Sequence, residues 1–386
     1  MVEHIAYFDN AATTFPKPEE VYVFVDKFYR ECGVNVGRGQ YRLASKASSL
    51  VSDTRELLLD LNHSNNKSVI FNNTATEALN IILRGFSWCD GMTVYISPFE
   101  HNAVTRVLQY LNKSFRLNIE MLDFDNKRLV YNLDGIKEQF KRKPPNMVVV
   151  SHASNVCGIV APIEGIFTLA KQFDATTVID MCQTMGLIDT DLSSDIYDYA
   201  VFAGHKTLYS PFGVGGFICS SSANVAPLII GGTGMDSASQ ELPDTIPERY
   251  EVGSSNIMAI AGLNASLRWI KELSMVAIRN KEHENKGRLV ELLNRYDNIQ
   301  IVASSSLNET IGVVSCVFDG YASDSIGQIL SGKNVAVRTG LHCAPTAHKS
   351  LGTFPTGTVR FSVGYFNDDR DFEVLEEVLS HIHKNS

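Results

Sequence analysis

The sequence lacks features that mark several specialised classes of protein. No apolar run approaches the roughly eighteen residues needed to cross a membrane, and no signal peptide is indicated at the N-terminus. Basic residues do not predominate, because 34 Lys and Arg face 43 Asp and Glu, and the charges are scattered without blocks. We therefore expect neither a membrane nor a nucleic acid as a partner.

Paired cysteines are also missing. The seven cysteines are dispersed and form no CxxC pair. An odd number of dispersed cysteines in a long chain argues against a disulfide framework and against a zinc knuckle. The sequence therefore predicts a protein of the reducing cytoplasm without a metal site.

What the sequence does contain is an alternation of apolar strands and amphipathic helices. A chain of 386 residues exceeds the usual size of one core, so two domains are expected. Strands are predicted at 69–71, 93–97, 147–150, 177–179, 199–203 and 215–219, and helices at 76–86, 102–111 and 162–173. This alternation predicts an α/β fold, in which a mostly parallel sheet carries helices on both faces.

The pattern changes after about residue 277. Helices near 276–295, 324–330 and 369–383, with strands at 312–318, 335–338 and 358–363, predict a smaller α+β domain. A long helix at 257–273 leads into it. We assign residues 15–275 to a large α/β domain, and residues 1–14 together with 276–386 to the small one. The polar arm at 7–16 is expected to pack near the functional site.

The best candidate for chemistry is Lys206. It follows the apolar strand 199–203 and Gly204, and it precedes a loop rich in turn residues. A partly desolvated lysine in such a place can lose its proton near neutral pH and condense with an aldehyde as a Schiff base. The candidate cofactor is pyridoxal phosphate. The alternative is an ordinary solvated lysine.

Ligands of parallel sheets lie at the carboxyl ends of the strands, so polar residues just after strands deserve a functional interpretation. After 69–71, the free amides near Ala75 and the hydroxyl of Thr76 at a helix start can hold a phosphate. An ordinary threonine N-cap is the alternative. After 93–97, His101 can lie flat against an aromatic ring, although a lone histidine is more often structural.

Two further strand ends carry polar residues. Asn155 follows 147–150 and can reach a ring oxygen of the cofactor, or can simply belong to a turn. Asp180 closes an apolar strand, where an unpaired carboxylate is costly and requires a cationic partner such as a protonated pyridine nitrogen. Gln183 is close enough to reach the same ring. The alternative for Asp180 is a cap of the next helix.

Taken together, these segments resemble the fold type I pyridoxal phosphate enzymes, and among them the class V aminotransferase and cysteine desulfurase family, closest to the SufS-like (group II) cysteine desulfurases and selenocysteine lyases. The resemblance covers nearly the whole chain. It is carried by the segments 9–14, 76–77, 100–101, 154–155, 204–206, 249–254 and 338–344, together with Asp180 and Gln183.

The resemblance implies specific roles and partners. Lys206 is implied as the Schiff-base lysine, His101 as the residue stacked on the ring, Asp180 as the partner of the ring nitrogen, Gln183 and Asn155 near the ring substituents, and Ala75, Thr76 and His205 on the phosphate. It also implies a homodimer, in which Ser254 of one chain contacts the phosphate in the other chain's site.

The loop from Arg338 to Cys343 resembles the active-site loop of group II desulfurases, where a cysteine thiolate takes the substrate's sulfur as a persulfide and alanine leaves. Cys343 lies on a turn after Gly340, and nearby Arg338 and His342 are expected to favour the thiolate. The alternative is a small buried apolar cysteine. Arg360 matches the family's clamp for the substrate carboxylate, to which Asn155 and Arg338 also contribute.

Three departures accompany the match. Ala203 stands where many relatives have a hydroxyl, Leu341 replaces a histidine, and Met181 with Cys182 is unusual beside the aspartate. We expect a cytoplasmic, homodimeric enzyme that acts on L-cysteine, or on L-selenocysteine as a close variant, and that passes sulfur to an acceptor protein. The alternatives are a class V aminotransferase or lyase that does not use Cys343, and a catalytically silent scaffold.

Overall fold

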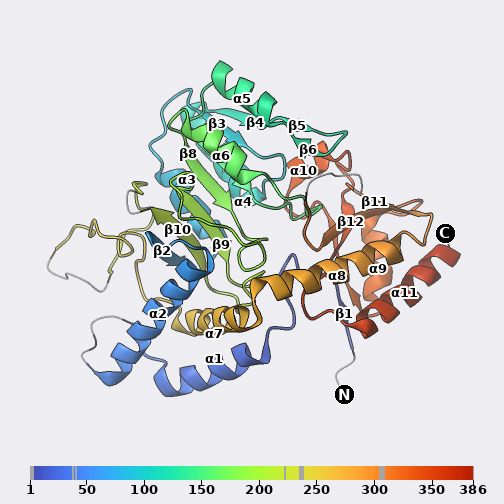
Figure 1. Ribbon diagram of the computed structural model, residues 1–386, viewed down its shortest axis with the longest axis horizontal. Helices are drawn as coiled ribbons and strands as arrows, with labels where there is room; N and C mark the ends of the chain where they lie inside the picture. Colours follow the sequence, from blue (N-terminus) through green and yellow to red (C-terminus); the bar gives the residue numbers. More distant parts are fainter. Residues whose placement is uncertain are drawn as a thin grey trace.

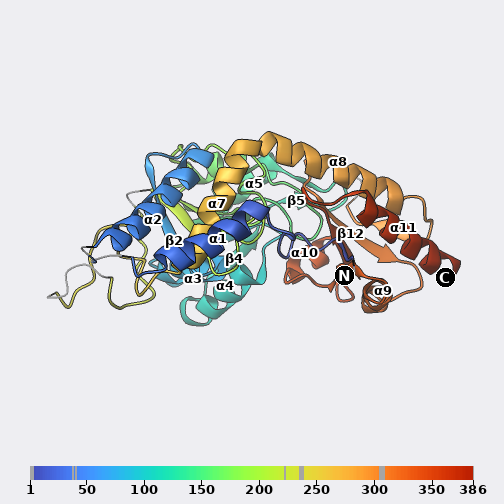
Figure 2. The same ribbon diagram turned by 90° about the horizontal axis from the view of Figure 1, so that it is seen from below.

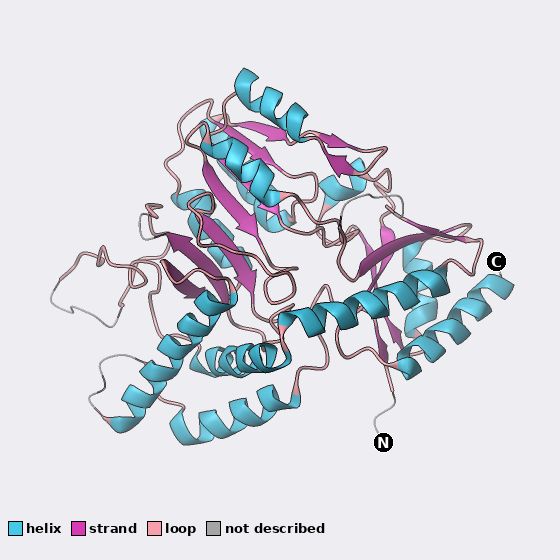
Figure 3. Cartoon of the chain, viewed as in Figure 1, coloured by secondary structure: helices cyan, strands magenta, loops and turns pink. Residues whose placement is uncertain are grey.

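The computed structural model describes residues 4–36, 39, 41–220, 223–233, 239–303 and 309–385. Its centre is a seven-stranded sheet (Figures 1 and 3). In spatial order the strands are β2 (Lys67–Asn72), β10 (Gly215–Ser220), β9 (Tyr199–Ala203), β8 (Thr176–Asp180), β7 (Met147–Ser151), β3 (Thr93–Ile96) and β4 (Asn118–Met121). Only β10 runs antiparallel to its neighbours, so the prediction of a mostly parallel sheet is confirmed.

The sheet separates two apolar cores, which explains its strand sequences. In β7, Val148 and Val150 pack into one core, whereas Met147 and Val149 pack into the other. Because successive side chains of a strand point to opposite faces, a strand that is covered on both sides reads as a continuous apolar run.

Helices supply the two covering layers. One core contains residues of α1 (Glu19–Cys32), α2 (Arg42–Leu61), α5 (Leu133–Arg142), α6 (Ile163–Lys171) and α7 (Ile257–Leu273). The opposite core contains residues of α3 (Ala75–Gly85) and α4 (Asn102–Phe115). Two short strands, β5 (Phe124–Asp125) and β6 (Val130–Tyr131), form a separate hairpin.

The C-terminal part forms a second, antiparallel sheet of four strands. Their order is β11 (Ile299–Ile301), β12 (Val313–Phe318), β15 (Thr358–Ser362) and β14 (Arg338–Gly340). The accompanying helices are α8 (Met275–Leu293), α9 (Ser323–Ser331), α10 (Pro345–Ser350) and α11 (Asp369–Lys384). Helix α8 runs from the end of α7 to this second unit (Figures 1 and 2).

The N-terminal arm belongs to this second unit. Strand β1 (Ala6–Tyr7) pairs in parallel with β13 (Val335–Ala336), and Ala6 and Phe8 lie in the same apolar core as α11. The predicted strand 335–338 is therefore two short strands, β13 and β14, which pair with different partners. The exact boundary between residues 275 and 276 stays a prediction.

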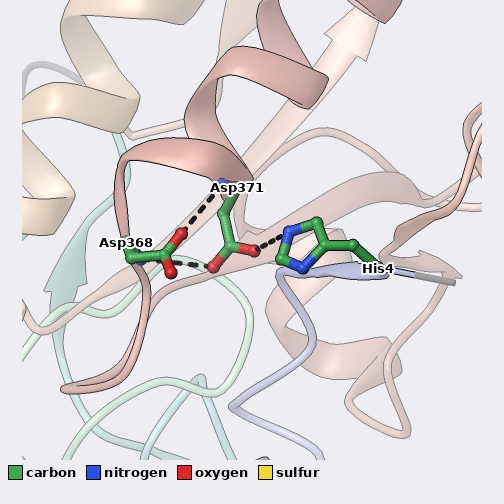
Figure 4. A group of neighbouring side chains, drawn as sticks. All are labelled: His4, Asp368 and Asp371. Atoms are coloured by element: carbon green, nitrogen blue, oxygen red, sulfur yellow. Dashed lines mark hydrogen bonds and ion pairs between the residues drawn. The ribbon is translucent and has the colours of Figure 1, made fainter. Parts of the chain in front are cut away.

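A small polar cluster joins the arm to the start of α11 (Figure 4). Asp368 caps the helix by accepting the N–H of Asp371, whose own carboxylate accepts the N–H of Asp368. His4 Nε2 lies 3.0 Å from the other oxygen of Asp371. The cluster brings three possible metal-ligand atoms together, but a reciprocal helix cap already accounts for both carboxylates. Among the described helices, none combines the length and apolarity that a membrane crossing requires.

Candidate active site

A cavity of about 370 Å³ opens where the carboxyl ends of the sheet strands face the second unit. It gathers all but one of the predicted site residues: Ala75, Thr76, His101, Asn155, Asp180, Gln183, His205, Lys206, Arg338, Cys343 and Arg360. Ser254 is the exception, because it is exposed and lines a separate, smaller depression. Its contact with a second subunit's site stays a prediction.

Lys206 reaches the cavity from the turn after β9. Gly204 starts this turn, and a Cβ added there would lie 2.9 Å from the carbonyl oxygen of Val214, so only glycine fits. The N-terminal arm holds the next two residues, since the hydroxyl of Thr13 donates to the His205 carbonyl and that of Thr14 to the Lys206 carbonyl. Within the described chain the Lys206 amine forms no ion pair and remains available to a ligand.

One end of the cavity suits a phosphate. The predicted threonine N-cap is present at Thr74, whose hydroxyl accepts the N–H of Glu77, and Thr76 lies on the cavity wall. The N–H groups at the start of α3 therefore face the cavity beside the Thr76 hydroxyl, as in other anion sites at helix N-termini.

His205 adds a polar atom at this end. Its buried Nδ1 has no hydrogen-bond partner in the described structure. Burial, with Lys206 and Lys17 nearby, lowers the pKa of His205 to about 3, so the ring is neutral. The ring stacks on Phe212 at a centroid distance of 4.5 Å, a contact that no local sequence signal indicated.

Asp180 and His101 stand at the middle of the cavity. The buried Asp180 carboxylate accepts the N–H of Cys182 at 2.9 Å, and it forms no ion pair with any described residue. No described helix begins just after it, which rules out the helix-cap alternative. Burial raises the pKa of the Cys182 thiol well above its usual value, so this second cavity cysteine is a neutral thiol.

His101 has two roles in the structure. Its Nδ1 accepts the N–H of Ala103 at 3.0 Å and caps α4, which assigns the proton of the neutral ring to Nε2. Burial and then Lys206 lower the pKa of His101 and keep the ring neutral. His101 is therefore a structural residue that caps α4, and it also lies on the cavity wall.

The other end of the cavity is built around Arg360 of β15. Its side chain is only 2% exposed. Nη2 donates to Asp9 Oδ1 at 2.7 Å, Nη1 donates to the Asn155 carbonyl at 3.0 Å, and Nε is buried without a partner. Arg338 donates to the other oxygen of the same Asp9. Asp9 belongs to the sequence motif 9–14, but no local pattern indicates this role for it.

Cys343 lies on the loop between β14 and α10. Gly340, His342 and Cys343 all have positive φ, so the loop is sharply turned, and the Cys343 side chain is exposed at the cavity. Two hydrogen bonds join the loop to the unit that contains the seven-stranded sheet. The N–H of Asn102 donates to the Cys343 carbonyl at 2.7 Å, and Asn155 Nδ2 donates to the His342 carbonyl at 2.8 Å.

The expected role of His342 is wrong. Its ring turns inward, and Nε2 lies 2.8 Å from the Thr358 hydroxyl. Burial and the charge of Arg360 lower the pKa of His342 to about 2. A neutral, inward-facing imidazole cannot stabilise a thiolate on Cys343 as a cation.

Comparison with known proteins identifies this arrangement. Residues 6–375 match the aminotransferase class-V family. The chain belongs to that family. A probable cysteine desulfurase of Pyrococcus abyssi is 29% identical over 393 residues, which span 100% of this chain and 96% of the relative. Another, from Methanothermobacter thermautotrophicus, is 27% identical over 98% of this chain and 95% of its own.

Solved structures agree with this class-V assignment. The apo cysteine desulfurase of Thermococcus onnurineus superposes with a TM-score of 0.91 at 27% identity, covering 99% of this chain and 95% of its own. The cysteine desulfurase CsdA of Escherichia coli, at 21% identity, shares the fold with a TM-score of 0.84, covering 99% and 95% of the two chains. The α/β fold predicted from the sequence, that of fold type I pyridoxal phosphate enzymes, is confirmed.

Proposed function

We propose that this class-V protein is a pyridoxal phosphate-dependent cysteine desulfurase, which converts L-cysteine to L-alanine and keeps the sulfur as a persulfide on Cys343. The observation that carries the proposal is the position of Cys343. An exposed thiol on a fixed loop lines the same cavity as an unpaired lysine and a buried arginine. An aminotransferase has no use for such a thiol.

The residues of the cavity fit the cofactor. The start of α3 and the unpartnered His205 nitrogen would hold the phosphate, and the unpaired Asp180 carboxylate would face a protonated ring nitrogen. His101 would lie against the ring, and the Lys206 amine would bond to the aldehyde carbon. When bound, pyridoxal phosphate supplies an electron sink that stabilises negative charge at the substrate's Cα and weakens the bond from Cβ to sulfur.

The protein's own groups then carry out the remaining steps. Arg360 binds the substrate carboxylate, which fixes the orientation of the amino acid. The Lys206 amine takes the Cα proton and later returns a proton to carbon. The Cys343 thiolate attacks the substrate's sulfur, the electron pair of the carbon–sulfur bond stays with Cβ, and Cβ takes up a proton. Cysteine and a thiol thereby become alanine and a persulfide without any external oxidant or reductant.

The sulfur must then leave Cys343. Helix α10 begins at Pro345, only two residues after the cysteine, so the thiol stands on a short and fixed loop. We propose an acceptor protein that approaches this loop, because a short loop cannot carry the persulfide far. A small-molecule thiol is expected to be a poorer acceptor.

The test compares Cys343→Ala with a matched control, Cys89→Ala. Cys89 is the other exposed cysteine of the described chain and does not line the cavity. We expect wild type and Cys89→Ala to release alanine from cysteine and, without reductant, to gain one sulfur atom in intact-mass spectrometry. Cys343→Ala should keep the cofactor's visible absorption but release no alanine at a useful rate. Full alanine release by Cys343→Ala would show that Cys343 does not take up the sulfur and would favour a lyase. Amino transfer from alanine to a keto acid by wild type would favour a transaminase.

A further inference from the structure

One carboxylate serves two arginines at the substrate end of the cavity. Asp9 Oδ1 accepts from Arg360 at 2.7 Å, while Oδ2 accepts from Arg338 at 3.1 and 3.2 Å. The two guanidinium groups differ in burial, since Arg360 is 2% and Arg338 47% exposed. Among the described residues, Asp9 is the only carboxylate within ion-pair distance of either arginine.

The charges at this end of the cavity do not cancel. Two guanidinium groups and one carboxylate leave a single net positive charge, which suits one carboxylate of a ligand. Arg360 still has a donor for it, because its buried Nε has no hydrogen-bond partner among the described residues. Arg338 also lines the cavity, but Asp9 already occupies its Nε and Nη2.

Asp9 is fixed in this position by its backbone. It forms an isolated β-bridge with Ser362, which lies two residues after Arg360 on β15. Its carbonyl accepts the N–H of Ala12 at 3.0 Å and the hydroxyl of Tyr7 at 3.3 Å. Burial and the Asp9 charge raise the pKa of Tyr7 to about 12, so this hydroxyl remains a donor at any physiological pH. A ligand therefore meets Asp9 already in place between the two arginines.

We propose that Asp9 is a specificity-determining residue, which occupies Arg338 so that the cavity accepts amino acids with one carboxylate and rejects those with a second carboxylate on the side chain. The inference rests on the proposed function in that Arg360 is taken to bind the substrate carboxylate. Cysteine and alanine carry one negative charge at that end, so they balance the site. A dicarboxylic amino acid would bring a second negative charge toward Asp9, and like charges in close proximity discriminate against the wrong ligand.

The test removes the charge of Asp9 and keeps its shape. In Asp9→Asn, Arg338 becomes a free cation in the cavity. We expect the ratio of affinities for L-aspartate over L-alanine, measured from the spectral change of the cofactor-loaded protein, to rise about tenfold, as one new charged hydrogen bond implies. The cofactor-free protein should show the same shift for succinate over propionate by calorimetry.

Two controls make the outcome decisive. The double variant Asp9→Asn/Arg338→Ala restores a single positive charge and should return both ratios to the wild-type level. Asp26→Asn removes a carboxylate from an exposed ion pair on α1 and should change neither ratio. An unchanged ratio in Asp9→Asn, or a raised ratio that persists in the double variant, overturns the proposal.

Loss of folding is checked separately. If Asp9→Asn unfolds, Arg338→Ala alone still tests the idea. It lowers the net charge for both ligands, but an arginine already bonded to Asp9 offers no hydrogen bond to a second carboxylate, so the succinate-to-propionate ratio should stay within twofold of wild type. A large fall in that ratio would show that Arg338 is open in the wild type. The calorimetry needs no turnover, so it remains informative even if the protein releases no alanine from cysteine and the proposed function fails.

Discussion

Lys17 is a buried lysine whose amine forms three contacts with the arm and the turn that carries Lys206. It donates to the hydroxyls of Thr13 and Thr14 at 3.4 and 2.9 Å, and to the His205 carbonyl at 2.7 Å. Burial lowers the pKa of Lys17 from its usual value to about 7. The folded state therefore favours the neutral amine, which can still donate two of these bonds.

This pKa predicts a pH dependence of stability. Between pH 7 and about 10, the unfolded chain binds the Lys17 proton and the folded chain does not, so the free energy of unfolding should rise with pH across this window. Lys17→Met should reduce that rise, whereas Lys27→Met, which alters an exposed lysine of α1, should preserve it. Urea titrations at pH 6.5 and 9.5 measure the difference. If the free energy of unfolding changes equally between the two pH values in both variants, the low pKa of Lys17 is contradicted.

At the scale of an element, the loop from β14 to α10 depends on the small sheet beneath it. The Thr358 hydroxyl of β15 lies 2.8 Å from His342 Nε2 and donates to Ser315 Oγ at 3.1 Å. His342 Nδ1 is already buried without a partner. Among the described residues, Thr358 thus supplies the one side-chain hydrogen bond of the His342 ring.

Thr358→Val should break this anchor with little change of shape. Removing the side-chain partner of the His342 ring is expected to lower the free energy of unfolding by about 1–3 kcal/mol. The loosened loop should also let iodoacetamide alkylate Cys343 faster. Thr358→Ser keeps the hydroxyl and should restore both values, which denaturant titration and timed mass spectrometry measure. If the valine variant matches wild type in both, the loop is held by its backbone bonds alone.

The helices and strands differ in how well the sequence predicts their bounds. The predicted bounds of β9 and α7 agree residue for residue with the structure, because each is a long apolar stretch with clear turn residues at its ends. The short strands β1, β5 and β11, the edge strand β4 and the six-residue helix α10 were not predicted. Each has too few buried side chains to impose a period on the sequence.

In the candidate site, too, some features could be predicted from the sequence and others could not. Lys206, Asp180 and Asn155 were found because each follows a buried strand, and parallel strands bring their carboxyl ends to one edge. The pairing of Asp9 with Arg338 and Arg360 was not found, because it joins residues more than 300 positions apart and leaves no local pattern. The inward turn of the His342 ring was also missed, because its partner Thr358 lies 16 positions further along the chain, on β15.

At the scale of the whole molecule, the arm connects the two sheets. Phe8 lies in the core of the C-terminal unit, while Thr13 and Lys17 bond to the turn that carries Lys206. One continuous piece of chain, residues 8–17, therefore lies along the cavity, and Asp9 is near its start. The arm thus contacts both the turn that carries Lys206, through Lys17, and Arg360, through Asp9.

Helices α1 and α7 form a surface with several exposed large apolar side chains. Helix α1 exposes Tyr22, Val23 and Tyr29 by 45, 58 and 52%, and α7, which packs beside α1 (Figure 1), exposes Met258 by 44%. Side chains of this kind are enriched where proteins associate. Ser254 stands just before α7, in a depression that Glu77 of α3 also lines, beside the end of the cavity that suits a phosphate.

We therefore predict a two-fold dimer, in which this surface is buried and Ser254 completes the phosphate site of the second chain. Two-fold dimers are the commonest oligomers. In such a dimer every contact between the subunits occurs twice, so both phosphate sites would receive a Ser254. Val23→Asp combined with Tyr29→Asp should convert the dimer to a monomer in light scattering and weaken pyridoxal phosphate binding. Tyr110→Asp, a matched change of an exposed tyrosine on α4 across the sheet, should do neither. Ser254→Ala should keep the dimer's mass and still bind the cofactor more weakly. A wild-type monomer with full cofactor occupancy would show instead that each chain builds its phosphate site alone, from the start of α3 and His205.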